Sequence, residues 1–159
     1  MNNRTKLIDI TGNIIINKDC ETVFDYFSNY TNDKFWRKVI HETKINTDHI
    51  EKNSIITENS FLSRRIPNYI TTFKCIDFQP DKLIICETTA ENTFWSKNTR
   101  YVEALTGNIT KVTYRFQLDI NIVKHGLGFR LPTFLVYLHT KLEMKKYLSA
   151  LKRILEKRK

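Results

Sequence analysis

A long helix predicted for residues 132–157 is the feature that most constrains the fold of this chain. Pro132 suits the first turn of a helix, and apolar residues continue at helical spacing to about Lys157. At about 1.5 Å per residue this helix is roughly 39 Å long, enough to cross a whole sheet. Most of the residues before it have a sequence pattern typical of β-strands. The chain therefore has to pack one long helix against a sheet.

This helix carries two apolar stripes on nearly opposite sides. The first stripe contains Val136, Tyr137, Met144, Tyr147, Leu148, Leu151, Ile154 and Leu155. The second stripe stops halfway and contains Leu131, Leu135, Leu138 and Leu142. Because a helix that is apolar on two sides must bury both or expose one, three interpretations stay open. The sheet and the first helices enclose it, one stripe faces an apolar ligand, or one stripe contacts a second copy or a membrane.

Seven strands are predicted before the long helix. Residues 109–120 alternate most clearly, with Val112, Tyr114 and Phe116 on one face and charged or polar residues on the other. The remaining strands are predicted at residues 7–16, 42–47, 54–61, 68–78, 83–89 and 94–105. Gly12 interrupts the first strand and predicts a bulge there. A loop containing Gly126 and Gly128 is expected between the last strand and the long helix.

Two short helices are predicted after the first strand. Asp19 is a good N-cap for a helix over residues 20–28, in which Val23, Phe24 and Phe27 have the spacing of a core face. A second helix over about residues 32–40 presents Phe35 and Trp36. Strands that follow one another antiparallel, with the helices confined to one face of the sheet, make this an α+β fold. At 159 residues it is expected to be a single domain, residues 1–159.

The net charge of +9 is concentrated at the C-terminal end. Residues 141–159 contain eight basic and two acidic residues, a net +6. One interpretation is a solvated helix face whose cations complement the helix dipole. The other is an electrostatic surface for RNA, the ribosome or anionic lipid.

No catalytic or metal-binding motif accompanies this pattern. The three cysteines are widely spaced, and the four histidines have no metal-ligand spacing, so we expect neither metal nor cofactor. His139 falls near the middle of the long helix, where a packed or surface position is favoured over one facing a cavity. No apolar run approaches the length of a membrane span, and the polar start of the chain does not resemble a secretory signal. A cytoplasmic protein is therefore expected.

The order of these elements resembles a known superfamily. The segment INKDCETVFDYFSNYTNDKFW (residues 16–36) resembles the opening of the polyketide cyclase/dehydrase branch of the START/Bet v 1-like (SRPBCC) superfamily. CIDFQPDKLI (75–84), YVEALTGNITKVTY (101–114) and LSALKRILE (148–156) resemble its later hairpins and helix end. The resemblance implies a helix-grip fold, in which a curved seven-stranded antiparallel sheet surrounds a long C-terminal helix and encloses an apolar cavity. It carries over no common catalytic residue.

An apolar ligand in that cavity is the function that the resemblance favours. The expected ligand-binding residues are Trp36, Phe73, Trp95, Tyr101, Tyr114, Phe116, Leu135 and Leu138. Which alternate residues of the 94–105 strand face the cavity stays open. Phe35 and Trp36 are expected to form a lid. The leading hypothesis is binding or transport of a lipid, quinone or polyketide-like molecule. The alternatives are an aromatase/cyclase-type enzyme and a ribosome- or RNA-interacting regulator that uses the basic helix.

Overall fold

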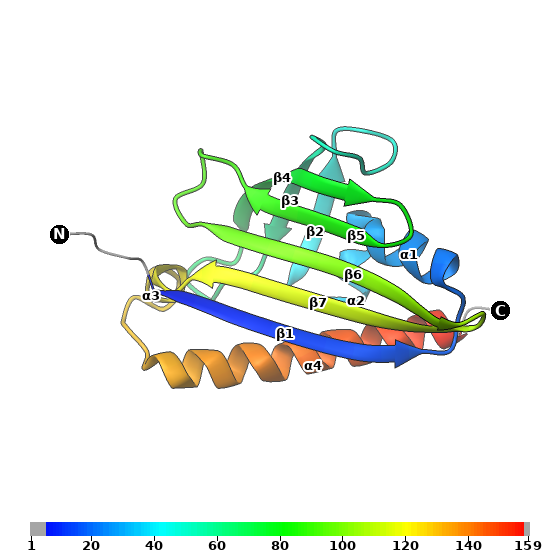
Figure 1. The fold of residues 1–159 in the computed structure, drawn as a ribbon. Coiled ribbons are helices and arrows are strands. Elements are labelled where there is room, and N and C mark those ends of the chain that lie inside the picture. The colour runs from blue at the N-terminus through cyan, green and yellow to red at the C-terminus, as the bar shows by residue number, and fades with distance from the viewer. Residues whose placement is uncertain (1–5, 158–159) are drawn as a thin grey trace.

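The computed structural model describes residues 6–157 and contains one seven-stranded antiparallel sheet (Figure 1). The first part of the chain forms β1 (Leu7–Ile16), α1 (Cys20–Ser28), the 3-10 turn η1 (Tyr30–Asn32), α2 (Asp33–Trp36), β2 (Ile40–Ile45) and β3 (Ile55–Ser60). The second part forms β4 (Tyr69–Gln79), β5 (Leu83–Thr88), β6 (Ser96–Thr106), β7 (Ile109–Asp119), α3 (Asn121–Leu127) and α4 (Thr133–Lys157). The predicted α+β helix-grip fold is confirmed.

The strand order is β1-β7-β6-β5-β4-β3-β2, so the first two strands of the chain form opposite edges of the sheet. The segment containing α1, η1 and α2 makes the connection between these edges. Register shifts interrupt the pairing within β2, β4 and β6. Such irregularities bend strands, and they suit a sheet that curls around its concave side.

Gly12 does not form the predicted bulge, because β1 pairs with β7 without a register shift. Its role is to let α4 approach β1 closely (Figure 1). A Cβ atom at this position would lie 2.7 Å from Met144 Cγ and 2.8 Å from Leu148 Cδ1. The absence of a side chain at Gly12 therefore fixes how near the helix sits to the edge strand.

The two stripes of α4 have different surroundings. Five residues of the first stripe are buried in the core: Val136, Met144, Leu148, Leu151 and Leu155. In the second stripe Leu135, Leu138 and Leu142 are exposed by 43, 52 and 60%. The interpretation that sheet and N-terminal helices enclose both sides of the helix is therefore wrong.

The two short helices pack as a cover over one end of the concave side. Asp19 caps α1 as predicted, because its Oδ1 accepts a hydrogen bond from the backbone N–H of Thr22 at 2.8 Å. Val23, Phe24 and Phe27 are buried in the core, which confirms their predicted role. α2 is shorter than predicted, because the chain leaves the helix at Arg37 and enters β2 at Ile40.

The segment expected to be a loop before α4 contains a short helix, α3. Gly128 ends this helix with φ of 85°, a left-handed conformation that glycine adopts without strain. Gly126 lies against Leu62, where a Cβ would come within 3.1 Å of Leu62 Cγ. Within residues 6–157, no helix combines the length and apolar character that a membrane span requires.

Candidate functional site

A buried ionic layer lies under α2, on the concave side of the sheet. Asp33 and Arg37 stand four residues apart, and Arg37 Nη1 donates to Asp33 Oδ2 at 2.9 Å. The same Nη1 contacts Glu58 Oε2 of β3 at 2.9 Å. Arg100 of β6 reaches Asp33 Oδ2 from the other side, at 2.5 Å. Two cations and two carboxylates thus share one site from which water is largely excluded.

Aromatic rings surround the guanidinium of Arg100. Its Cζ lies 3.6 Å from the ring centroid of Tyr30 and between 5.1 and 5.8 Å from those of Phe27, Trp36 and Tyr114. Arg100 also donates to the carbonyl oxygen of Phe27. Cation–π contacts and this carbonyl partly replace the lost hydration. The aromatic rings fill much of the concave side at this end of the sheet.

Burial and neighbouring charges shift the pKa values of Glu58 and Arg37 in opposite directions. Burial raises the pKa of Glu58, although the neighbouring Arg37 acts to lower it. Burial acts to lower the pKa of Arg37, but the carboxylates of Glu58 and Asp33 raise it well above its usual range. Arg37 therefore stays cationic. Its Nε atom has no hydrogen-bond partner among residues 6–157.

We call the small cavity beside Arg37 the inner hollow. It has a volume of about 180 Å³ and lies between β7, α4 and the segment that follows α2. Its polar lining residues are Arg37, Tyr114, His139, Thr140, Glu143 and Tyr147. Its apolar lining residues are Val39, Phe116 and Met144. An apolar cavity of about 150 Å³ can hold a benzene ring, so the inner hollow has room for a group about the size of one ring.

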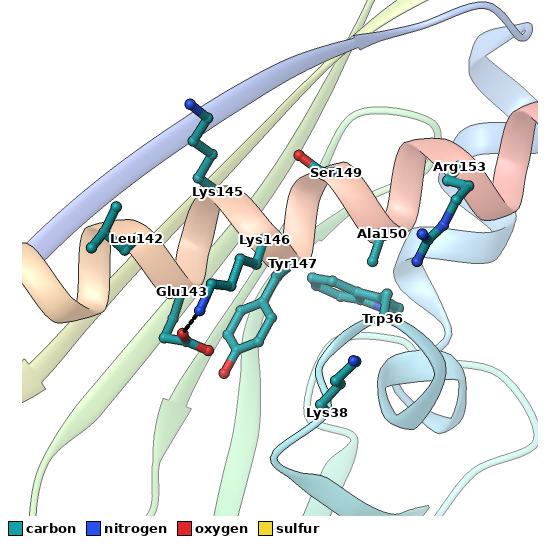
Figure 2. A pocket seen from close by; sticks show the side chains of 10 residues that line it. All are labelled: Trp36, Lys38, Leu142, Glu143, Lys145, Lys146, Tyr147, Ser149, Ala150 and Arg153. Atoms are coloured by element: carbon teal, nitrogen blue, oxygen red, sulfur yellow. Dashed lines mark hydrogen bonds and ion pairs between the residues drawn. The ribbon is translucent and has the colours of Figure 1, made fainter.

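We call the larger opening beside Trp36 the outer cleft. It has a volume of about 700 Å³ and lies between α4 and the end of α2 (Figure 2). Apolar surface comes from Trp36, Leu142, Ala150 and the ring of Tyr147. Charged or polar groups come from Lys38, Glu143, Lys145, Lys146, Ser149 and Arg153. The outer cleft thus combines an apolar surface with a mainly cationic rim.

Glu143 and Tyr147 line both the inner hollow and the outer cleft. Figure 2 shows both side chains leaving the same side of α4, with Glu143 turned to the ammonium of Lys146, 2.7 Å away. Burial raises the pKa of Tyr147 to about 12, so its hydroxyl is protonated at neutral pH and able to donate a hydrogen bond. These two residues form the partition between the two spaces.

Three of the predicted ligand-binding residues come together at this site. Trp36 lines the outer cleft, and Tyr114 and Phe116 line the inner hollow. The ring centroids of Trp36 and Tyr114 lie 5.8 Å apart, with the rings edge to face. Trp36 itself is only 1% exposed, whereas Phe35 is 59% exposed and lines neither space. Trp36 is thus part of the floor of the cleft and not a lid, and Phe35 lines neither space, so the predicted Phe35–Trp36 lid is not found.

The other predicted residues lie elsewhere. Phe73 is buried in β4, outside both spaces. Tyr101 lies on the face of β6 opposite to Arg100, and Trp95 donates its indole N–H to Glu87, which lies on the outward face of β5. Leu135 and Leu138 face solvent on α4. Strand parity or helix rotation turns four of these residues away from the concave side: Trp95, Tyr101, Leu135 and Leu138.

The ionic layer is the part of the site that sequence reasoning missed. Arg100 and Asn98 share the buried parity of β6 with Val102. That pattern of polar and apolar residues gave no clear sign of which parity faces inward. The spacing of Asp33 and Arg37 was the one local signal, because an i,i+4 pair on a short helix favours contact. His139 is exposed on α4, which agrees with the expected packed or surface position, and it also lines the inner hollow.

Comparison with known proteins supports the fold. No protein-family model and no curated protein matches the chain. Solved structures do match. A START superfamily protein from Mycobacterium smegmatis has a TM-score of 0.73 at 10% identity, covering 93% of this chain and 97% of that chain. The Zhui aromatase/cyclase from Streptomyces sp. R1128 has a TM-score of 0.73 at 9% identity, covering 96% of each chain.

A conserved protein from Geobacillus kaustophilus is similar to the same degree, with a TM-score of 0.71 at 8% identity, covering 94% of this chain and 95% of that chain. At these identities the likeness concerns the path of the backbone. It confirms the fold that the sequence resemblance implied. The chain therefore has the START-like helix-grip fold found in START superfamily proteins and polyketide aromatase/cyclases.

Proposed function

We propose that this protein binds an apolar small molecule with an anionic end, and that the outer cleft is the binding site. The observation that carries the proposal is an apolar surface around Trp36 and Ala150, next to a rim of cations. Burial of apolar surface contributes about 0.8 kcal/mol per CH₂ group. A chain or ring system in the outer cleft would gain affinity in this way.

The cations of the rim favour an anionic end. Lys38, Lys145 and Arg153 form no ion pair with another residue of the described range 6–157. Lys146 is already paired with Glu143. The unpaired cations are available to a carboxylate or phosphate. Among the ligand classes that the fold suggests, fatty acids and acidic polyketide-like molecules therefore fit better than neutral quinones.

A cyclase-type enzyme acting on a polyketide-like substrate is the second candidate. The inner hollow favours it, because the buried, cationic Arg37 and the two tyrosines Tyr114 and Tyr147 line a space for one ring. A cation and phenolic donors would stabilise negative charge that develops on a carbonyl oxygen during an aldol closure. His139 would accept and return the proton. The similarity to aromatase/cyclases is consistent with this candidate through the fold alone.

Calorimetric titration with decanoate and with decanol tests the proposed binding. Decanoate carries the anionic end and decanol does not, so we expect decanoate to bind more tightly. Ala150→Phe places a ring in the outer cleft and should weaken both ligands at least tenfold. Ala104→Phe is the matched control, because Ala104 is exposed on β6, away from the cleft. Undiminished decanoate binding by Ala150→Phe, with normal thermal unfolding, contradicts the proposal.

Charge reversal separates the anionic end from the apolar body. Lys38 and Arg153 are exposed, so Lys38→Glu and Arg153→Glu leave the core intact. Together they should weaken decanoate and leave decanol unchanged. Enzyme activity is tested separately, by following the near-ultraviolet absorbance of an aromatic product formed from a linear poly-β-ketone with loss of water. A wild-type protein that binds decanoate but does not accelerate this closure has the first function and not the second.

A further inference from the structure

The outward face of the first half of α4 is an apolar surface that no other part of residues 6–157 covers. We call Phe134, Leu135, Leu138 and Leu142 the leucine face. These side chains are between 43 and 64% exposed, and they lie on the side of the helix opposite to the buried Val136 and Met144. Phe129, which is 58% exposed, precedes the helix. Exposed apolar residues clustered on one helix face are typical of an interaction surface.

The charges around the leucine face have one sign. From Phe129 to Leu142 the chain contains Arg130 and Lys141 and no acidic residue. Lys145 and Lys146 follow one turn later, on the two sides of the row that Leu138 and Leu142 form. The first carboxylate after the face, that of Glu143, is held by Lys146. The surface is therefore apolar along its middle and cationic along its sides.

We propose that the leucine face docks on an anionic lipid bilayer. A helix that presents leucines and phenylalanines between lysines can lie in the plane of the interface. The apolar side chains enter the boundary between headgroups and acyl chains, while the lysine stems extend the ammonium groups back to the anionic headgroups. Each cation near such a surface adds to the attraction. α4 lies on the membrane in this arrangement and does not cross it.

The charge pattern argues against two other occupants. In a two-fold dimer through the leucine face, the same patch meets itself, so the lysines beside one face would lie near the lysines beside the other. An RNA strand would neutralise the lysines, but its phosphates would leave the leucines without an apolar partner. An anionic bilayer matches both the apolar and the cationic parts.

The leucine face leads into the outer cleft, because Leu142 belongs to both. Docking would therefore bring the opening beside Trp36 close to the bilayer. A ligand with an apolar body and an anionic end could then pass between the lipid and the cleft. This last step rests on the proposed function, whereas docking itself requires no bound ligand.

Vesicle co-sedimentation tests the docking. Vesicles of phosphatidylcholine alone are compared with vesicles that also contain about one third phosphatidylglycerol. We expect wild type to bind the anionic vesicles at least tenfold more tightly, and binding to fall with added salt. Leu138→Gln with Leu142→Gln, and separately Lys141→Gln with Lys145→Gln, should each weaken binding about tenfold. The matched control is Ile70→Gln with Leu105→Gln, two exposed apolar residues of the sheet, which should bind as wild type does.

Three other outcomes would overturn the proposal that the leucine face docks on a bilayer. Equal loss of binding in the sheet control would show that the leucine face is not the contact. Absence of vesicle binding, together with a dimer that the leucine variant dissociates in light scattering, would assign the face to a second copy. Binding of a short RNA instead of vesicles, unchanged in the leucine variant, would assign the cations to nucleic acid. Decanoate binding by the same variants is measured in a separate titration. A failure of bilayer docking is therefore distinguishable from a failure of ligand binding in the outer cleft.

Discussion

Arg100 of β6 and Asp33 of α2 form an ion pair with 2.5 Å between Nη2 and Oδ2, although their side chains are only 1% and 0% exposed. Arg37 contacts the same Asp33 oxygen, so one carboxylate serves two cations. Charges are costly to bury unless they are paired. The pair therefore fixes α2, and Trp36 with it, against the concave side of the sheet. It sets the position of the floor of the outer cleft.

Asp33→Ala should destabilise the protein by about 3–5 kcal/mol, because it leaves the guanidinium of Arg100 buried without its carboxylate. The free energy of unfolding in urea measures this effect. Asp9→Ala is the matched control, because Asp9 pairs with Arg115 on the surface, where both side chains are more than 40% exposed. The control should lose less than about 1 kcal/mol. Similar losses in the two variants would contradict the structural role assigned to Asp33.

Arg37→Met should make stability depend on pH through Glu58. Burial already raises the pKa of Glu58, and the variant removes the cation that opposes this shift. The folded state then keeps a proton that the unfolded state releases above its ordinary pKa of about 4.3. Stability is therefore greatest below that pH and falls as pH rises through the raised folded pKa. The deficit relative to wild type should be larger at pH 7 than at pH 5.

Adding Glu58→Gln to Arg37→Met provides the control for this prediction, since the amide cannot ionise. Urea unfolding of the double variant should show a pH dependence close to that of wild type. A deficit of Arg37→Met that is the same at both pH values, or larger at pH 5, would mean that Glu58 is not the group responsible.

Gly12→Ala should destabilise the protein by about 1–3 kcal/mol, because the added methyl group meets Met144 Cγ and forces α4 away from β1. The thermal unfolding midpoint is the readout. Gly107→Ala is the matched control, since a Cβ at Gly107 meets no atom within 4 Å. A Gly12→Ala protein as stable as wild type would show that close approach of the helix does not require glycine.

Much of the fold could be predicted from local patterns. Alternation in residues 109–120 located β7, and the spacing of Val23, Phe24 and Phe27 located α1, because one face of each element is buried. Helical spacing identified the two apolar stripes of α4, but it did not decide that the first stripe, with five buried residues, is the one that packs in the core. Periodicity identifies a buried face wherever packing against the core is the main constraint.

The site was less predictable, because long-range packing decides it. The side that Tyr101 faces depends on how β6 pairs with β7, and the pattern of the strand alone left this open. Arg37 and Glu58 are 21 residues apart, and their contact exists only once β2 and β3 have paired. Gly12 suggested a bulge because the helix that passes over it is 132 residues away along the chain, at Met144.

The central claim is that Trp36 forms the floor of a cleft that holds an apolar molecule. Trp36 and Trp95 are the two tryptophans, so the protein has two indole N–H resonances in its proton–nitrogen spectrum. A titration with decanoate is predicted to shift the Trp36 indole resonance together with the amides of Tyr147 and Ala150, and to leave the Trp95 indole in place. Movement of the Trp95 indole alone, or saturation with decanoate without any shift at Trp36, would contradict the claim.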